Sequence, residues 1–310
     1  MKAVRYHGYG APDVLRVDEA DRPTPGPGQV VLRVAGTSFN GVDAGIRGGY
    51  LQPVFPVTLP HVPGVDVAGT VTEVGAGVTG LRVGDAVIGM LPMTAPGATA
   101  EFVAAPAELL TAAPTTVPLA DAAALPAVGL TAWQALTEHA DLGPGQRVLI
   151  NGAGGAVGGY AVQLAARAGA TVLATASPRS SEVVRAHGAH EVVLHTATPL
   201  TEAVTEPVDV LLNLVAGLPE QGAALLGLVR PGGSFLNLTP PAPAAVPGVR
   251  VAEVYVRSDA GQLAQLVALV DAGELRIDVA ARRPFGELAA VHAESDAGTL
   301  RGKVVLVPEP

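Results

Sequence analysis

Apolar and polar residues alternate over short segments in the first third of the chain, which predicts a domain rich in β-strands. Glycine- and proline-rich turns, such as the one at 23–28, separate the segments. Many short strands with turns of this kind favour a compact, barrel-like domain. The expected strands cover residues 15–17, 29–35, 67–74, 83–89 and 100–104.

The pattern changes after two helical stretches between 119 and 139, which Pro126 separates. Apolar strands then alternate with helical segments, and this βα rhythm predicts a parallel, doubly wound sheet. The expected strands are 148–150, 171–176, 191–194, 208–214, 234–238 and 249–256, and the helices between them include 157–168, 182–187 and 221–229. An amphipathic helix at 259–272 and a last strand at 302–307 do not continue the rhythm. We therefore expect one domain of residues 1–115 completed by 258–310, and a second of 116–257.

Five glycines lie between Gly152 and Gly159, directly after the first strand of this second domain. Ala153, Gly155 and Gly158 have the spacing of the dinucleotide fingerprint, with alanine at its first position. Such a turn lets the backbone approach a pyrophosphate, and the N-terminus of the following helix favours negative charge. We expect the cofactor's phosphates to meet this turn, whose residues are Ala153, Gly154, Gly155, Ala156, Val157 and Gly158.

The second strand of the unit lacks the acid that normally follows it. NAD-binding folds carry Asp or Glu there to hold the ribose 2′-hydroxyl, but this chain has no carboxylate between Asp141 and Glu182. Ser177, Arg179 and Ser180 follow the strand instead, and a guanidinium with hydroxyls suits a 2′-phosphate. The pattern favours NADPH over NADH. The alternative is that Arg179 is only a solvated loop charge.

Composition narrows the class of protein further. Of the 310 residues, 49% are hydrophobic and 15% charged, as in a well-buried globular protein. The net charge of −9 argues against nucleic acid or an anionic membrane as partner. There is no cysteine, so disulfides and cysteine-based metal sites are excluded. No signal peptide or membrane span is predicted, and we expect a cytoplasmic protein.

Several stretches, taken in order, resemble the zinc-independent quinone oxidoreductases of the medium-chain dehydrogenase/reductase superfamily. The resemblance runs nearly end to end. It is carried by MKAVRYHGYGAPDVLRV, PGPGQVVLRV, FNGVDAGIRGGY, LPHVPGVDVAGTVTEVG, GDAVIG, AEFVAAP, AAALPAVGLTAWQAL, the fingerprint, VRPGGSFLNL and RGKVVLV. It implies an α/β fold: a GroES-like, β-rich catalytic domain completed by the C-terminal segment, with an inserted Rossmann domain and the active site in the cleft.

Zinc-dependent relatives carry Gly-His-Glu where this chain has Gly64, Val65 and Asp66. Valine cannot ligate a metal, and the cysteine ligands are missing too. We therefore expect no metal. His61 lies close by in sequence, but without such partners we expect it to be a hydrogen-bonded surface or core residue.

The resemblance also implies site residues. Asn40 is expected near the nicotinamide and substrate, and Asp43 is expected to cap backbone N–H groups. Tyr50 corresponds to a substrate-contacting tyrosine, although a packing role is open, and Thr131 to a position beside the cofactor, with helix packing as its alternative. The strand ends at Val215, Ala216, Leu238 and Thr239 are expected to line the nicotinamide pocket. Many relatives have a lysine at the position of Ser180, as part of their 2′-phosphate site. In this chain we expect Arg179 to take the place of that lysine.

The implied activity is hydride transfer from NADPH to a quinone or another α,β-unsaturated carbonyl compound. Without a metal the acceptor must already be activated, and the protein supplies orientation, water exclusion and hydrogen bonds. Two alternatives remain: an enoyl reductase acting on a thioester or biosynthetic intermediate, and a catalytically idle nucleotide-binding protein. The resemblance further implies a homodimer, joined through the apolar strand at 249–256.

Overall fold

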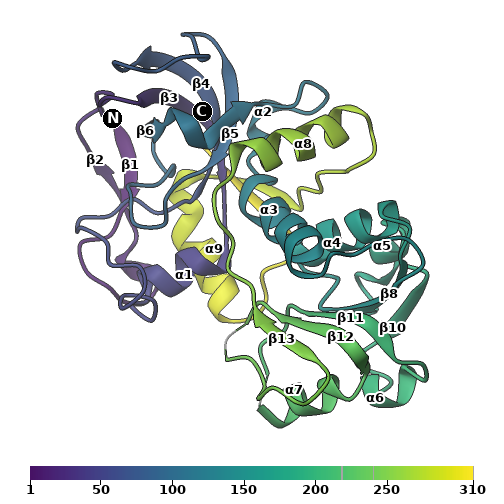
Figure 1. Cartoon of the computed structure of the whole chain (residues 1–310). Helices are drawn as coiled ribbons and strands as arrows, with labels where there is room; N and C mark the ends of the chain where they lie inside the picture. The colour runs from purple at the N-terminus through teal and green to yellow at the C-terminus, as the bar shows by residue number, and fades with distance from the viewer. Residues whose placement is uncertain (218, 240, 310) are drawn as a thin grey trace. The chain divides into compact units, whose positions relative to one another are not determined.

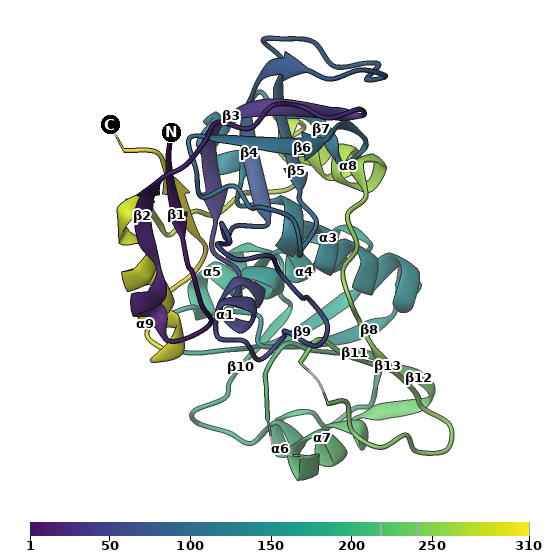
Figure 2. The ribbon, with the colours of Figure 1, turned by 90° about the vertical axis from the view of Figure 1, so that its left-hand side faces the viewer.

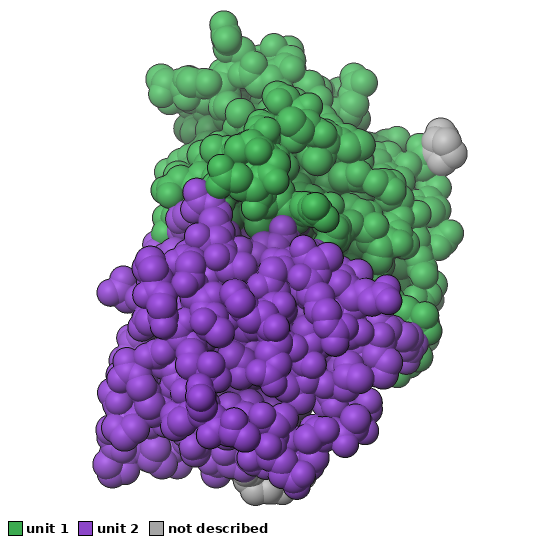
Figure 3. Space-filling model, turned by 90° about the vertical axis from the view of Figure 1, so that its right-hand side faces the viewer, with its two compact units in different colours: residues 1–127, 258–310 green, residues 128–257 purple. Residues whose placement is uncertain are grey.

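The computed structural model describes residues 1–217, 219–239 and 241–309, without the side chains of Pro219 and Glu220. The chain divides into two compact units (Figure 3). Unit 1 contains residues 1–127 and 258–310, and unit 2 contains residues 128–257. No helix among the described residues has the length and apolar character needed to span a lipid bilayer.

Unit 1 is built mainly from short strands, as the alternating pattern predicts. Its N-terminal part contains β1 (Lys2–Arg5), η1 (Pro12–Val14), β2 (Arg16–Glu19), β3 (Gln29–Ser38), α1 (Gly41–Arg47), β4 (Asp66–Val74), β5 (Ala86–Met90), β6 (Phe102–Pro106), η2 (Ala107–Leu109), β7 (Leu110–Ala112) and α2 (Leu119–Ala122). Its C-terminal part contains α8 (Ala260–Asp271), β14 (Ala281–Pro284), η4 (Phe285–Glu287), α9 (Leu288–Asp296) and β15 (Val304–Val307).

One sheet of unit 1 has the strand order β14-β15-β3-β4-β5-β7, with β6 paired to β3. The long strand β3 joins its parts, because β4, β6 and β15 all pair with it antiparallel. Apolar residues that alternate along these strands form one core, which includes Val30, Leu32, Val67 and Leu306. The β-rich domain predicted from the alternation is therefore confirmed as a unit with its own hydrophobic core.

The C-terminal strand returns to the N-terminal segment, as its break from the βα rhythm predicts. Val305 of β15 pairs with Ser38 of β3. The helix α9 before it packs on α1 and η1, and lies beside the β1–β2 hairpin in Figure 2. This pairing brings Lys303, near the end of the chain, to the residues that follow β3.

Unit 1 extends to Ala127 rather than to residue 115. The reason is α2, which packs on β3, β4 and β15. Its Asp121 also forms an ion pair with Arg282 of β14. These contacts attach α2 to the β-rich unit, whereas the helical pattern from 119 onward led us to expect it in the second domain.

Unit 2 alternates strands and helices, and α3 leads into it. The elements are α3 (Pro126–Gln134), the π-helical turn η3 (Ala135–His139), β8 (Arg147–Asn151), α4 (Ala156–Arg167), β9 (Thr171–Ala176), α5 (Ser181–Ala186), β10 (Glu191–Leu194), α6 (Leu200–Ala203), β11 (Val208–Asn213), α7 (Pro219–Leu226), β12 (Val229–Asn237) and β13 (Arg250–Glu253).

Among the described residues of unit 2, six strands form a sheet in the order β10-β9-β8-β11-β12-β13, and every pair is parallel. Helices α4 and α5 cover one face, and α6 and α7 cover the other (Figure 1). Counted within the unit, the order is 3-2-1-4-5-6, the Rossmann arrangement, which confirms the predicted doubly wound sheet. The order reverses between β8 and β11, where such folds bind their ligands at the carboxyl ends of the strands.

Candidate functional site

Unit 2 contains a cavity of about 910 Å³ at the carboxyl ends of its parallel strands. Its walls come from the turn after β8, the end of β9, the loops after β10, β11 and β12, and parts of α6 and α7. Several of the predicted cofactor residues line it: Gly154, Gly155, Ser177, Ser180, Val215, Ala216 and Thr239. Among the lining residues that the structure describes, none is Asp or Glu. A cavity of this size with no acidic side chain suits a ligand that carries phosphates.

The other cofactor residues predicted at the fingerprint turn and the strand ends are not among those that line the cavity, but they lie at that turn or next to lining residues. Ala153 is buried beneath the turn, and Ala156, Val157 and Gly158 form the first turn of α4, for which Gly155 is the N-cap. Arg179 is exposed on the loop after β9, and Leu238 donates its N–H to Asn213.

The last glycine of the fingerprint, Gly158, is required by close backbone approaches. A Cβ added to Gly158 would lie 2.5 Å from the Ala153 Cα and 2.5 Å from the Gly152 oxygen. The glycine therefore lets α4 pack directly against the turn. This is the function expected of the last fingerprint glycine, and it places the N-terminus of α4 beside the turn.

Two hydroxyls gather at the end of β9. The Ser177 and Ser180 Oγ atoms lie 3.1 Å apart, and the Ser177 N–H donates to the Ser180 Oγ over 3.2 Å. A Cβ on Gly154 would collide with the Ser180 hydroxyl, so the serine lies against the fingerprint turn. The loop after β9 thus presents hydroxyls and the Arg179 guanidinium where an NAD-binding fold carries a carboxylate.

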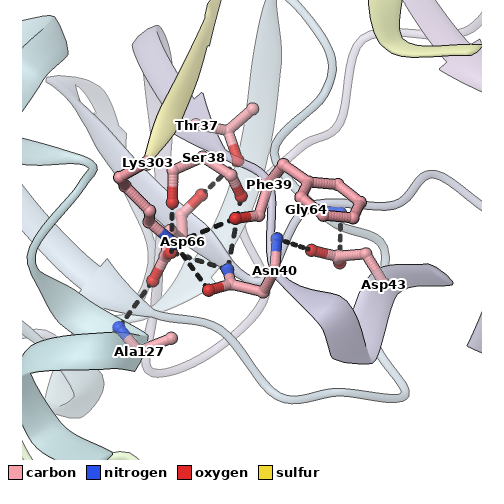
Figure 4. Close-up of polar contacts among 9 residues, drawn as sticks. All are labelled: Thr37, Ser38, Phe39, Asn40, Asp43, Gly64, Asp66, Ala127 and Lys303. Atoms are coloured by element: carbon pink, nitrogen blue, oxygen red, sulfur yellow. Dashed lines mark hydrogen bonds and ion pairs between the residues drawn. The ribbon is translucent and has the colours of Figure 1, made fainter. Parts of the chain in front are cut away.

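A second polar site lies in unit 1, around the predicted residue Asn40. Asn40 is the N-cap of α1 and is 8% exposed. Its Nδ2 donates to Asp66 Oδ2 over 2.8 Å and to the Ser38 oxygen over 3.3 Å (Figure 4). Its Oδ1 accepts from Lys303 Nζ over 2.6 Å. Both amide hydrogens are engaged, so Asn40 has no hydrogen left to donate to a further ligand.

Asp66 and Lys303 form a buried ion pair beneath Asn40, with Nζ 3.4 Å from Oδ2 (Figure 4). The Ala127 N–H donates to Asp66 Oδ1 over 2.7 Å, and the Ser38 hydroxyl donates to Oδ2. Lys303 also donates to the Phe39 oxygen over 3.0 Å. Burial lowers the pKa of Lys303, while the carboxylates of Asp66 and Asp43 oppose that change.

Asp43 caps backbone groups, as predicted. Its Oδ2 accepts from the Asn40 N–H over 3.0 Å, and its Oδ1 accepts from the Gly64 N–H over 3.1 Å (Figure 4). Burial raises its pKa to about 7, although these two hydrogen bonds favour the charged form. Asp43 therefore fixes the residues that flank it, Asn40 and Gly64.

Tyr50 and Thr131 lie in different surroundings. The Tyr50 side chain is 84% exposed in the turn after α1, so its ring is not part of the unit 1 core. Thr131 is buried on α3. Tyr50 and Asn40 belong to unit 1 and Thr131 to unit 2.

His61 is a buried core residue. Its ring packs edge-on against Tyr6, with ring centres 5.4 Å apart, and burial lowers its pKa to about 4. Within the described part of the chain, no three His, Asp or Glu side chains gather closely enough to hold a metal ion.

The sequence reasoning missed two sets of polar residues. It did not anticipate that Lys303 and Ser38 join Asp66 around Asn40. Nor did it single out Asn151, Asn213 and Asn237, which end three neighbouring strands and line the cavity of unit 2.

Comparison with known proteins agrees with both units. Residues 26–115 match the alcohol dehydrogenase GroES-like domain family, and residues 187–306 match the family described as zinc-binding dehydrogenase. A chloroplast envelope quinone oxidoreductase homolog from Arabidopsis thaliana is 34% identical over 328 residues, covering 99% of this chain and 98% of the relative. The chain belongs to the quinone oxidoreductase-type medium-chain dehydrogenases/reductases.

Two further similarities bear on the chemistry of this medium-chain reductase. A chloroplastic NADPH-dependent alkenal/one oxidoreductase of Arabidopsis thaliana is 32% identical over 322 residues, covering 100% of this chain and 80% of the relative. The solved structure of the CurK enoyl reductase superposes with a TM-score of 0.89 at 28% identity, covering 99% of both chains. The chain is thus an oxidoreductase that uses a nicotinamide cofactor and acts on a small-molecule substrate.

Proposed function

We propose that this medium-chain reductase uses NADPH to reduce quinones or other α,β-unsaturated carbonyl compounds. The observation that carries the proposal is the cavity of unit 2, where the fingerprint turn meets a β9 end with hydroxyls and no carboxylate. The names of the relatives support the class of acceptor, because they include a quinone oxidoreductase homolog and an alkenal/one oxidoreductase.

NADPH fits the residues present. The first turn of α4 and the fingerprint glycines would hold the pyrophosphate, since a helix N-terminus and close-lying backbone favour phosphate. Ser177, Arg179 and Ser180 would hold the 2′-phosphate by charge-assisted hydrogen bonds. Val215, Ala216, Leu238 and Thr239, in the loops after β11 and β12, would line the nicotinamide end.

Replacing Arg179 by alanine tests the cofactor preference. We expect the Kd for NADPH to rise about tenfold and the Kd for NADH to stay unchanged, because only NADPH carries the 2′-phosphate. Cofactor fluorescence titration measures both constants. Arg185→Ala is the matched control, since Arg185 is also an exposed arginine, on the adjacent α5. An undiminished NADPH preference in Arg179→Ala, or an NADH preference in the unaltered protein, would refute this assignment.

Bound NADPH supplies a hydride from its nicotinamide ring. We propose that the chain works without zinc, because it has Val65 where zinc-dependent relatives have a ligand and it has no cysteine. The Asp66 carboxylate beside Val65 is already paired with Lys303 and accepts from Ser38, Asn40 and Ala127. The acceptor must then be activated by its own conjugation, and the protein orients it and excludes water.

Asn40, Tyr50 and Thr131 are the side chains we propose to meet substrate or cofactor. The buried network around Asn40 keeps its amide in one orientation. The exposed Tyr50 phenol is free to hydrogen-bond a substrate carbonyl. Thr131 is proposed to lie beside the cofactor.

An enoyl reductase acting on a thioester is the second candidate, favoured by the similarity to the CurK enoyl reductase. Such an enzyme needs a proton donor opposite the incoming hydride, and no buried acid on this chain is assigned to that task. Tyr50 or solvent is the donor available to either reaction. Comparing enoyl thioesters with quinones as acceptors separates the two candidates.

We also propose a cytoplasmic homodimer. The strand β13 is the outermost strand of the unit 2 sheet, and such an edge pairs readily with another strand. Residues 249–256 around it would form the contact. Light scattering at micromolar concentration should give twice the mass of the chain, and a monomeric mass would contradict the dimer. The absence of cysteine fits a reducing compartment.

A further inference from the structure

Three asparagines form a hydrogen-bonded ladder across the floor of the unit 2 cavity. Asn151, Asn213 and Asn237 are the last residues of β8, β11 and β12, and Asn213 is in register with both neighbours. Asn151 Nδ2 donates to Asn213 Oδ1 over 2.8 Å, and Asn213 Nδ2 donates to Asn237 Oδ1 over 2.8 Å. Asn213 thus accepts from the strand on one side of it and donates to the strand on the other.

Backbone groups anchor both ends of the ladder. At one end, the Gly152 N–H donates to Thr175 Oγ1 over 2.7 Å, and that hydroxyl donates to Asn151 Oδ1 over 2.9 Å. At the other end, Asn237 Nδ2 donates to the Thr239 oxygen over 2.8 Å. A backbone N–H can only donate and a carbonyl can only accept. The direction of every hydrogen bond in the ladder is therefore fixed.

The ladder reaches three of the four segments that we propose to hold NADPH. Gly152 belongs to the fingerprint turn, and Thr239 to the loop after β12. The loop after β11 is included because Asn213 Nδ2 also donates to the Val215 oxygen over 3.0 Å. The Thr239 hydroxyl donates to the same Val215 oxygen, which joins the two loops to each other.

We propose that Asn213 is a positioning residue for the cofactor: through the ladder it holds the fingerprint turn and both loops in place before NADPH binds. Prearranged binding loops strengthen binding because less conformational freedom is lost on association. Asn213 is 7% exposed and occupies the central position, so its loss would break the ladder in both directions. The expected effect on NADPH affinity rests on the proposed NADPH site, whereas the expected ordering of the turn and the two loops does not.

Asn213→Asp is the informative variant. It keeps the shape of the side chain, but an ionised carboxylate has no hydrogen to donate. The oxygen that replaces Nδ2 would face the Asn237 Oδ1 and the Val215 oxygen, which are both acceptors. Asn151→Asp makes the same change at the first asparagine of the ladder, which is partly buried. It replaces Asn213→Asp in the experiment if that variant does not fold.

Hydrogen exchange of the cofactor-free protein gives the first measurement. In Asn213→Asp we expect amide exchange to be about tenfold faster at 152–155 and 214–217, as the ladder bonds are lost. Titration then should show an NADPH Kd about tenfold higher. Thr205→Asp is the control, because it adds the same charge to an exposed residue of unit 2 that is not among those lining the cavity. Its exchange at both segments and its NADPH Kd should stay within about threefold of the unaltered protein.

Unchanged exchange at both segments in Asn213→Asp and Asn151→Asp would overturn the positioning role. Equal losses of NADPH affinity in Asn213→Asp and Thr205→Asp would also overturn it, since the added charge alone would then explain the effect. If the unaltered protein binds no NADPH, the proposed cofactor fails, and the exchange data still decide whether the ladder holds the loops.

Discussion

Replacing Lys303 by methionine is expected to lower the free energy of unfolding by about 3–5 kcal/mol, since it leaves the buried Asp66 carboxylate without its cation. Lys303 is 4% exposed and donates to Asn40 and Phe39 in addition to pairing with Asp66. Methionine has a similar length and no charge. The loss of unfolding free energy therefore reflects the broken ion pair rather than a cavity. Chemical denaturation measures the change.

The only other lysine of the chain provides the matched control. Lys2 is exposed, and Lys2→Met is expected to change stability by no more than about 0.5 kcal/mol. The double variant Lys303→Met with Asp66→Asn should recover part of the loss, because no unpaired charge remains buried. Equal small losses in Lys303→Met and Lys2→Met would show that the buried pair does not hold this part of unit 1 together.

Replacing Gly158 by alanine is expected to weaken NADPH binding by at least about tenfold. The added Cβ would lie 2.5 Å from both the Ala153 Cα and the Gly152 oxygen, so α4 must move away from the turn. Forced overpacking of this kind costs about 1–3 kcal/mol, and here it displaces the helix N-terminus proposed to meet the phosphates. Cofactor titration and thermal unfolding of the same variant measure the two effects.

The neighbouring glycine should respond in the opposite direction. Gly159 lies in the same helix, and a Cβ there would meet nothing closer than the His187 Cε1 at 3.4 Å. Gly159→Ala should therefore stabilise the protein by up to about 1 kcal/mol, through helix propensity, and leave the NADPH Kd unchanged. If both variants bind NADPH like the unaltered protein, the fingerprint turn is not the phosphate site.

The sequence predicts the fold well where apolar periodicity is strong. The parallel strands of unit 2 are nearly continuous apolar runs, and the βα rhythm predicts that they pair in parallel. The helices α1 and α9 were not predicted. Residues 41–47 contain two glycines, which disfavour a helix, but Asn40 and Asp43 form a capping box that starts one. Along α9 the apolar face is weak, and its position depends on packing against α1 and η1.

The candidate site was only partly predictable, because its polar networks join residues far apart in the chain. Nothing local to Lys303 shows that it meets Asn40 and Asp66, since that meeting depends on β15 pairing with β3. The asparagine ladder did have a signal. Three apolar strands end in the same residue, in RVLIN, VDVLLN and SFLN, and parallel strands place their ends at one edge of a sheet.

The most direct test of the proposed function is NADPH oxidation by the purified protein with 1,4-quinones, alkenals and enoyl thioesters as acceptors, followed by the loss of NADPH absorbance. We predict turnover with quinones or alkenals, faster with NADPH than with NADH, and undiminished by a metal chelator. Turnover confined to enoyl thioesters would favour the second candidate. Tight binding of NADPH without turnover on any acceptor would contradict the proposed reductase and indicate a catalytically idle nucleotide-binding protein.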